Sequence, residues 1–123
     1  MKKTILVVDD EPMVTDFLTE FLSKEGYGVV SASDSREALL KVAARDFHLV
    51  IVDMDMARVN GAVLYDTLKE TGGGGIPVIA MSAGGITPSL VKSLAAGADG
   101  FITKPSDIGS IRQKVRKCLK ENA

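Results

Sequence analysis

Several acidic side chains stand where short apolar runs of the sequence end. Asp9 and Asp10 follow one such run, Asp53 ends another, and Asp55 comes two positions later. Carboxylate oxygens are ligands that Mg²⁺ prefers in proteins. A carboxylate held beside a metal ion can also attack phosphorus and form an acyl phosphate. These residue types therefore indicate metal binding and phosphoryl chemistry, provided that the fold brings them together.

Two further polar residues, Ser82 and Lys104, each follow another apolar run. An ammonium group can neutralise the oxygens of a transferring phosphoryl group, and a hydroxyl can donate a hydrogen bond to one of them. The alternative interpretation makes the acids solvated strand ends or helix N-caps, and Glu11 before Pro12 fits that role. Carboxylates ~4 Å apart repel by about 4 kcal/mol at an effective dielectric of 20, so a cluster needs a cation or a lysine among them.

The elements that must position these residues begin with five apolar runs. The runs are short, rich in Val and Ile, and continuous rather than alternating, which is typical of strands covered on both faces. They span residues 5–8, 27–32, 49–52, 77–81 and 100–103.

Helical patterns occupy the gaps between these runs. Asp34 and Glu37 have the spacing of a capping box, and Thr87 followed by Pro88 suits an N-cap and a first turn. The apolar stripes fall within residues 14–22, 34–43, 61–70, 87–94 and 108–119. Strict alternation of strand and helix predicts an α/β fold with a parallel sheet, right-handed crossovers and helices on both faces.

A doubly wound sheet of five parallel strands commonly takes the order 2-1-3-4-5, the flavodoxin-like (βα)5 arrangement. Ligands of such sheets bind at the carboxyl ends of the strands, where the first and third strands diverge. Here the first strand leads into Asp9 and Asp10, and the third ends at Asp53. The topology therefore predicts that these three carboxylates share one crevice.

Composition limits the class of protein. The chain has 123 residues, 46% apolar and 25% charged, so we expect one globular domain over residues 1–123. A net charge of −1 gives no positive field to hold nucleic acid, and apolar runs of about six residues are far below the ~20 that span a membrane. Cys118 is the only cysteine, which excludes an internal disulfide, suggests a small buried hydrophobe and fits a cytoplasmic protein.

The motifs, taken together and in this order, resemble the receiver domain of two-component response regulators. They are VVDDE (7–11), IVDM (51–54), Asn60-Gly61, MSA (81–83) and GADGFITKP (97–105), and they cover essentially the whole chain. The resemblance implies that Asp53 accepts a phosphoryl group from a sensor histidine kinase or a phosphotransfer protein. It implies a signalling protein that acts only on itself, by phosphotransfer and autodephosphorylation, rather than an enzyme.

The resemblance also implies a set of metal ligands. Asp10 and Asp53 would hold Mg²⁺ through their side chains, Asp9 would act mainly through water, and the backbone carbonyl of Asp55 would be a further ligand. Lys104 and Ser82 would contact the phosphoryl oxygens.

A conformational switch is implied as well. In the family, Ser82 and the aromatic residue of the fifth strand, here Phe101, move together on phosphorylation. The surface of the fourth helix, fifth strand and fifth helix then changes its preference for a downstream protein partner or output domain. Asp55 and Gly84 occupy the positions that tune the lifetime of the phosphorylated state.

Two alternatives remain at this stage. A haloacid-dehalogenase-like phosphatase would use Asp53 as nucleophile and Asp55 as general acid and base, but its nucleophile belongs on the first strand. A pseudo-receiver would signal by binding without being phosphorylated. The chain stops shortly after its last helix, so we expect either a stand-alone receiver or a piece of a longer regulator. The last helix is basic, with Arg112, Lys114, Arg116, Lys117 and Lys120. This is typical of a solvated face, and a docking surface for an acidic kinase or partner is the alternative.

Overall fold

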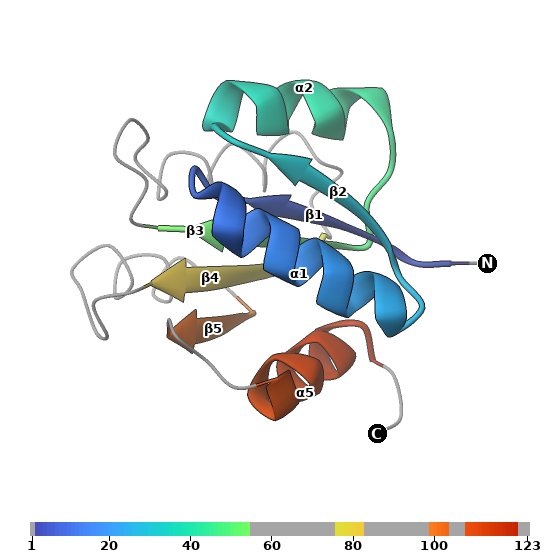
Figure 1. Ribbon diagram of the computed structural model, residues 1–123. Helices are drawn as coiled ribbons and strands as arrows, with labels where there is room; N and C mark the ends of the chain where they lie inside the picture. Colours follow the sequence, from blue (N-terminus) through green and yellow to red (C-terminus); the bar gives the residue numbers. More distant parts are fainter. Residues whose placement is uncertain (1, 55–75, 83–98, 104–107, 121–123) are drawn as a thin grey trace.

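The computed structural model describes residues 2–54, 76–82, 99–103 and 108–120. Its five strands form one sheet in the order β2-β1-β3-β4-β5, and each neighbouring pair is parallel (Figure 1). The strands are β1 (Thr4–Val8), β2 (Gly28–Ala32), β3 (Leu49–Asp53), β4 (Val78–Ser82) and β5 (Gly100–Thr103). The predicted α/β fold and strand order are confirmed.

Helices cover both faces of this sheet. The described helices are α1 (Pro12–Lys24), α2 (Ser35–Ala44) and α5 (Ile108–Cys118). Helices α1 and α5 pack on one face, where Leu18 and Val115 join a cluster with Ile51. Helix α2 lies on the other face, where Ala38 packs with Leu6 and Val52 (Figure 1). The two further helices expected within residues 61–70 and 87–94 fall outside the described residues.

The strands differ in how completely they are covered. Every residue of β3 and β4 is buried, as is every residue of β1 after Thr4. Four of the five residues of β2, and three of the four of β5, are only half-buried or exposed. The prediction of strands covered on both faces therefore holds for the three central strands. It is wrong for β2 and β5, which are the edges of the described sheet and have a neighbour among its strands on one side only.

Helix α1 has well-defined ends because of its flanking residues. Glu11 is the N-cap with extended backbone angles, and Pro12 occupies the first turn, where its missing N–H is not needed. At the other end Gly26 has a φ of 98°, a left-handed conformation that favours glycine. Its N–H donates to the carbonyl of Ser23, and the next N–H, of Tyr27, donates to that of Leu22. These two hydrogen bonds end the helix, and the chain continues directly into β2.

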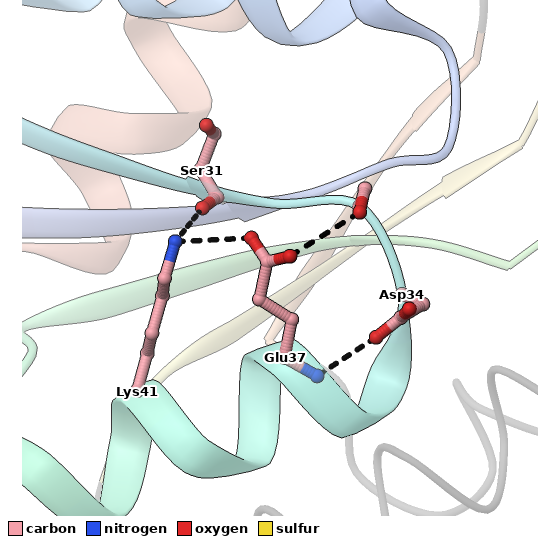
Figure 2. A network of polar contacts seen from close by, with 5 residues as sticks. Ser31, Asp34, Glu37 and Lys41 are labelled. Atoms are coloured by element: carbon pink, nitrogen blue, oxygen red, sulfur yellow. Dashed lines mark hydrogen bonds and ion pairs between the residues drawn. The ribbon is translucent and has the colours of Figure 1, made fainter.

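A polar network fixes the start of α2 (Figure 2). The Asp34 carboxylate accepts a hydrogen bond of 2.8 Å from the backbone N–H of Glu37, which confirms the predicted N-cap. The Glu37 carboxylate in turn accepts from the Ser33 hydroxyl at 3.3 Å and pairs with the Lys41 ammonium at 3.0 Å. Lys41 also donates to the backbone carbonyl of Ser31 in β2. The helix is thereby joined to the edge of the sheet.

Replacing Asp34 with alanine is expected to lower the free energy of unfolding by about 1 kcal/mol, because the N–H of Glu37 loses its acceptor. Asp34→Ser keeps a side-chain acceptor, so its free energy of unfolding should fall by only a small part of that amount. Urea unfolding measures the loss of stability in both variants, provided that the m-value equals that of the wild type. Equal losses in the two variants would show that the cap does not contribute.

Candidate functional site

The acidic residues of β1 and β3 meet at the carboxyl edge of the sheet. Val8 is in register with Val52, so the residues that follow each of them come from adjacent strands at the same level. One carboxylate oxygen from each of Asp9, Asp10, Glu11 and Asp53 can be chosen so that all lie within 4.8 Å of one another. The predicted gathering of Asp9, Asp10 and Asp53 is confirmed.

The four acids differ in exposure. Asp9 and Asp53 are 1% and 2% exposed, whereas Asp10 and Glu11 are exposed. The cluster therefore has a buried floor formed by two carboxylates and an open side formed by the other two.

Asp9 is held in place by the backbone on both sides. Its N–H donates to the carbonyl of Ala32 at 3.1 Å, which extends the pairing of β1 with β2 by one residue. One of its carboxylate oxygens accepts from the N–H of Glu11 at 2.9 Å. This turn brings the N-terminus of α1 to the cluster, and the positive end of a helix favours negative charge there.

Glu11 is a member of the cluster that the sequence interpretation missed. It was predicted to be a helix N-cap residue, and its backbone has that role, but its side chain makes no capping hydrogen bond. Its carboxylate lies instead with the three aspartates. The available signal was a run of three consecutive acids directly before Pro12, but the pattern does not tell which way an N-cap side chain points.

Ser82 and Phe101 occupy the strands that complete this edge. Asp53 is in register with Met81, so Ser82, which is completely buried, follows one residue later at the carboxyl end of β4. Phe101 lies in β5 and is 38% exposed. The structure thus places Ser82 at the same carboxyl edge of the sheet as the acids and leaves Phe101 at the rim of the sheet. Asp55, Gly84 and Lys104 lie outside the described residues, and their roles stay predictions.

The donor set fits a hard divalent cation. The cluster offers only carboxylate oxygens from the described residues, and two of the four acids are exposed, which leaves room for the water molecules that Mg²⁺ retains. Carboxylates at ~4 Å repel one another by about 4 kcal/mol at an effective dielectric of 20. A bound cation would remove this repulsion, so the geometry favours one.

The only cysteine belongs to a different part of the fold. Cys118 is half-buried, less than the full burial expected of a small hydrophobe, and its Sγ lies 3.9 Å from the carbonyl oxygen of Asp99. Burial raises the pKa of its thiol, the charge of Asp99 raises it further, and Lys117 acts in the opposite direction. A thiol with a raised pKa is a poor nucleophile near neutral pH.

Alkylation of Cys118 by iodoacetamide at pH 8 is therefore expected to be slower in the folded chain than in the same chain unfolded in urea. The raised pKa also means that the neutral thiol stabilises the fold below its ordinary pKa and that this contribution is lost as pH rises through the folded pKa. Equal alkylation rates in the two states would contradict this.

Within the described residues, no helix combines the length and the apolar character needed to cross a bilayer.

Comparison with known proteins gives a consistent picture. A family model for the response regulator receiver domain matches residues 5–116. A protein of Cyanophora paradoxa described as probable transcriptional regulator ycf27 is 35% identical over 97% of this chain, and the match covers 49% of that protein. The chain spans about half the length, or less, of the curated relatives that it matches first.

Two solved structures are similar to this chain over nearly their whole length. A CheY-like response regulator receiver domain protein from Methanospirillum hungatei has a TM-score of 0.91 at 29% identity, with 98% of this chain and 95% of that chain covered. The response regulator TrrA of Thermotoga maritima, solved in complex with Mg(2+)-BeF, has a TM-score of 0.83 at 32% identity, with 94% and 98% covered.

Proposed function

Because this chain belongs to the response regulator receiver domain family, we propose that Asp53 accepts a phosphoryl group from a sensor histidine kinase or a phosphotransfer protein. The chain is a receiver domain of two-component signalling, and the four-carboxylate cluster within 4.8 Å is the observation that supports phosphorylation at this edge. We further propose that residues 1–123 act as one receiver unit, as a stand-alone protein or as part of a longer regulator.

Asp53 is the best placed of the four acids to be the acceptor. It is buried at the end of the central strand β3, where a fixed backbone limits the directions its carboxylate can take. Asp10 and Glu11 lie on the open side, and one oxygen of Asp9 is committed to the N–H of Glu11. An acyl phosphate needs a carboxylate that is both positioned and flanked by groups able to hold a cation.

The site would hold Mg²⁺ through the side chains of Asp10 and Asp53, with Asp9 acting through water and the backbone carbonyl of Asp55 as a further ligand. Bound there, Mg²⁺ would neutralise negative charge on the transferring phosphoryl oxygens. TrrA, which is similar to this chain, was solved with Mg(2+)-BeF. Glu11 adds a fourth negative charge to the same cluster.

We propose that Asp53 is the nucleophile of this transfer. An oxygen of the Asp53 carboxylate bonds to phosphorus while the bond between phosphorus and the donor histidine nitrogen breaks, and the electron pair stays on that nitrogen. Ser82 donates a hydrogen bond to one phosphoryl oxygen, and the Lys104 ammonium neutralises another. Later attack of water on phosphorus releases phosphate and restores the carboxylate, so the domain turns over only its own phosphoryl group.

We propose that phosphorylation changes the edge of the sheet formed by β5. We propose that Ser82 and Phe101 move together when the phosphoryl group is present, and that the surface formed by the fourth helix, β5 and α5 changes its affinity for a protein partner or an output domain. Asp55 and Gly84 tune how long this state lasts. Asp55 would act by repelling the incoming phosphoryl group or by orienting the hydrolytic water.

The test is the intact mass of the chain after incubation with acetyl phosphate and Mg²⁺. We expect one base-labile phosphoryl group on the wild type and none on Asp53→Asn. Asp46→Asn is a matched control, because Asp46 is an exposed aspartate just before the opposite end of β3. Equal phosphorylation of the wild type and Asp53→Asn would refute the proposal.

The same experiment separates the alternatives. A haloacid-dehalogenase-like phosphatase would hydrolyse many equivalents of small phosphoesters, and it is not favoured, because the family model is that of a receiver and Asp53 ends the third strand of the chain. A pseudo-receiver would bind Mg²⁺ without gaining a phosphoryl group.

A further inference from the structure

Phe101 carries a cation over its ring. The Nζ of Lys114, in α5, lies 5.0 Å from the centroid of the Phe101 ring in β5. An ammonium group at this distance from an aromatic ring is attracted by the negative charge of the ring face. The contact joins an aromatic side chain that is 38% exposed to the helix that borders the last strand.

Two arginines of α5 have a carboxylate partner, which Lys114 lacks among the described residues. Arg112 and Arg116 both lie beside the carboxylate of Glu25, at 2.6 Å and 3.8 Å, and so connect α5 to the end of α1. Among the described residues, the structure gives Lys114 no carboxylate partner, and the contact shown for its ammonium group is the Phe101 ring. The charge of Lys114 is therefore directed to the ring rather than to an acid in this part of the chain.

The neighbouring strand presents little bulk beside Phe101. The residue in register with it on β4 is Ala80, a small side chain that is fully buried. Because side chains alternate along a strand, Ser82 points to the same face of the sheet as Ala80, two residues nearer the carboxyl edge. On the described part of β4, a ring turned from the rim toward Ser82 would pass beside the methyl group of Ala80, and it would move away from the Lys114 ammonium.

We propose that Lys114 holds the Phe101 ring in its outward position in the unphosphorylated chain and so sets the ratio of the two ring positions. This rests on the proposed function, in which Ser82 and Phe101 form the switch. A cation–π contact at an exposed site changes such a ratio by about two- to five-fold. Lys114 is thus a positioning residue that makes the chain harder to switch on without a phosphoryl group.

The test uses fluorine NMR of the chain labelled with fluorophenylalanine at its four phenylalanine positions, with the Phe101 signal assigned from Phe101→Leu. Mg²⁺ with beryllofluoride, a stable mimic of the acyl phosphate, defines the signal of the inward ring. The variants are Lys114→Gln, which removes the cation, and Lys114→Arg, which keeps it. Lys117→Gln is the matched control, an exposed lysine of the same helix.

Without beryllofluoride, the Phe101 signal of Lys114→Gln should move toward the inward position, corresponding to a two- to five-fold larger inward population. Phosphorylation by acetyl phosphate should accelerate by a similar factor. Lys114→Arg and Lys117→Gln should match the wild type. If Lys114→Gln also matches the wild type while beryllofluoride still moves the signal, the inference is wrong and the proposed function stands. If beryllofluoride moves no Phe101 signal in any variant, the proposed switch fails and the inference fails with it.

Discussion

Saturation with Mg²⁺ is expected to raise the free energy of unfolding of the wild-type chain by about 3 kcal/mol and to have much less effect on Asp53→Asn. A ligand that binds only the folded state stabilises it by ~2.7 kcal/mol when its free concentration is 100 times its Kd. Asp53 is one of the four acids that converge within 4.8 Å, and its amide counterpart is a weaker ligand for a hard cation. Asp53→Asn should therefore lose most of the stabilisation that Mg²⁺ gives to the wild type.

In the presence of EDTA the order of stability should be reversed. Asp53→Asn removes one of four clustered negative charges while keeping almost the same shape, and Asp53 is only 2% exposed, so water screens its repulsion poorly. We expect the variant to be more stable than the wild type by about 1–3 kcal/mol without metal. Urea unfolding with EDTA and with Mg²⁺ measures both effects, and Asp46→Asn serves as the exposed control. An equal gain from Mg²⁺ in all three chains would place the metal site elsewhere.

A second large effect is expected in the core beneath the site. Leu18 of α1 is 2% exposed and packs on the sheet face that it shares with Ile51, so Leu18→Ala should lower the free energy of unfolding by about 2–5 kcal/mol. Leu40 of α2 is 62% exposed, and Leu40→Ala should change stability by no more than about 0.5 kcal/mol.

The two leucine variants form a matched pair, because each makes the same chemical change inside a helix and alters helix propensity equally. Urea unfolding monitored by circular dichroism, with unchanged m-values, gives the difference between their free energies of unfolding. Leu18 is not one of the clustered acids, so Leu18→Ala should weaken Mg²⁺ binding only under conditions in which part of the chain is unfolded. Similar losses from Leu18→Ala and Leu40→Ala would contradict the packing described for α1.

The position of the carboxylates could be predicted from the sequence because it depends on topology more than on detail. Alternation of strands and helices leaves few arrangements of a parallel sheet, and the carboxyl ends of the first and third strands are adjacent in the commonest one. Asp9, Asp10 and Asp53 were therefore predicted together, and they lie together. The strand bounds were also close, with residues 49–52 predicted and Leu49–Asp53 found.

Features that depend on side-chain direction or on distant neighbours could not be predicted in this way. The run at residues 27–32 is as apolar as a central strand, and only the order of the sheet makes β2 an edge. Glu11 directly precedes Pro12 at the N-cap position, but its carboxylate lies with the acidic cluster and makes no capping hydrogen bond. The contact between Lys114 and Phe101 depends on how α5 lies against β5, and no local spacing encodes that.

The lysine that joins α2 to β2 has a consequence for how molecules of this chain meet. In β2 the N–H of Gly28 and the carbonyl of Ala32 both point inward to the chain segment of β1, so alternation directs the Ser31 carbonyl outward, to the unpaired side. The ammonium group of Lys41 donates a hydrogen bond to that carbonyl. An extended segment of a second molecule that sought to pair with β2 would first have to displace an ammonium group and bury its charge, so this rim resists the edge-to-edge aggregation to which bare strands are prone.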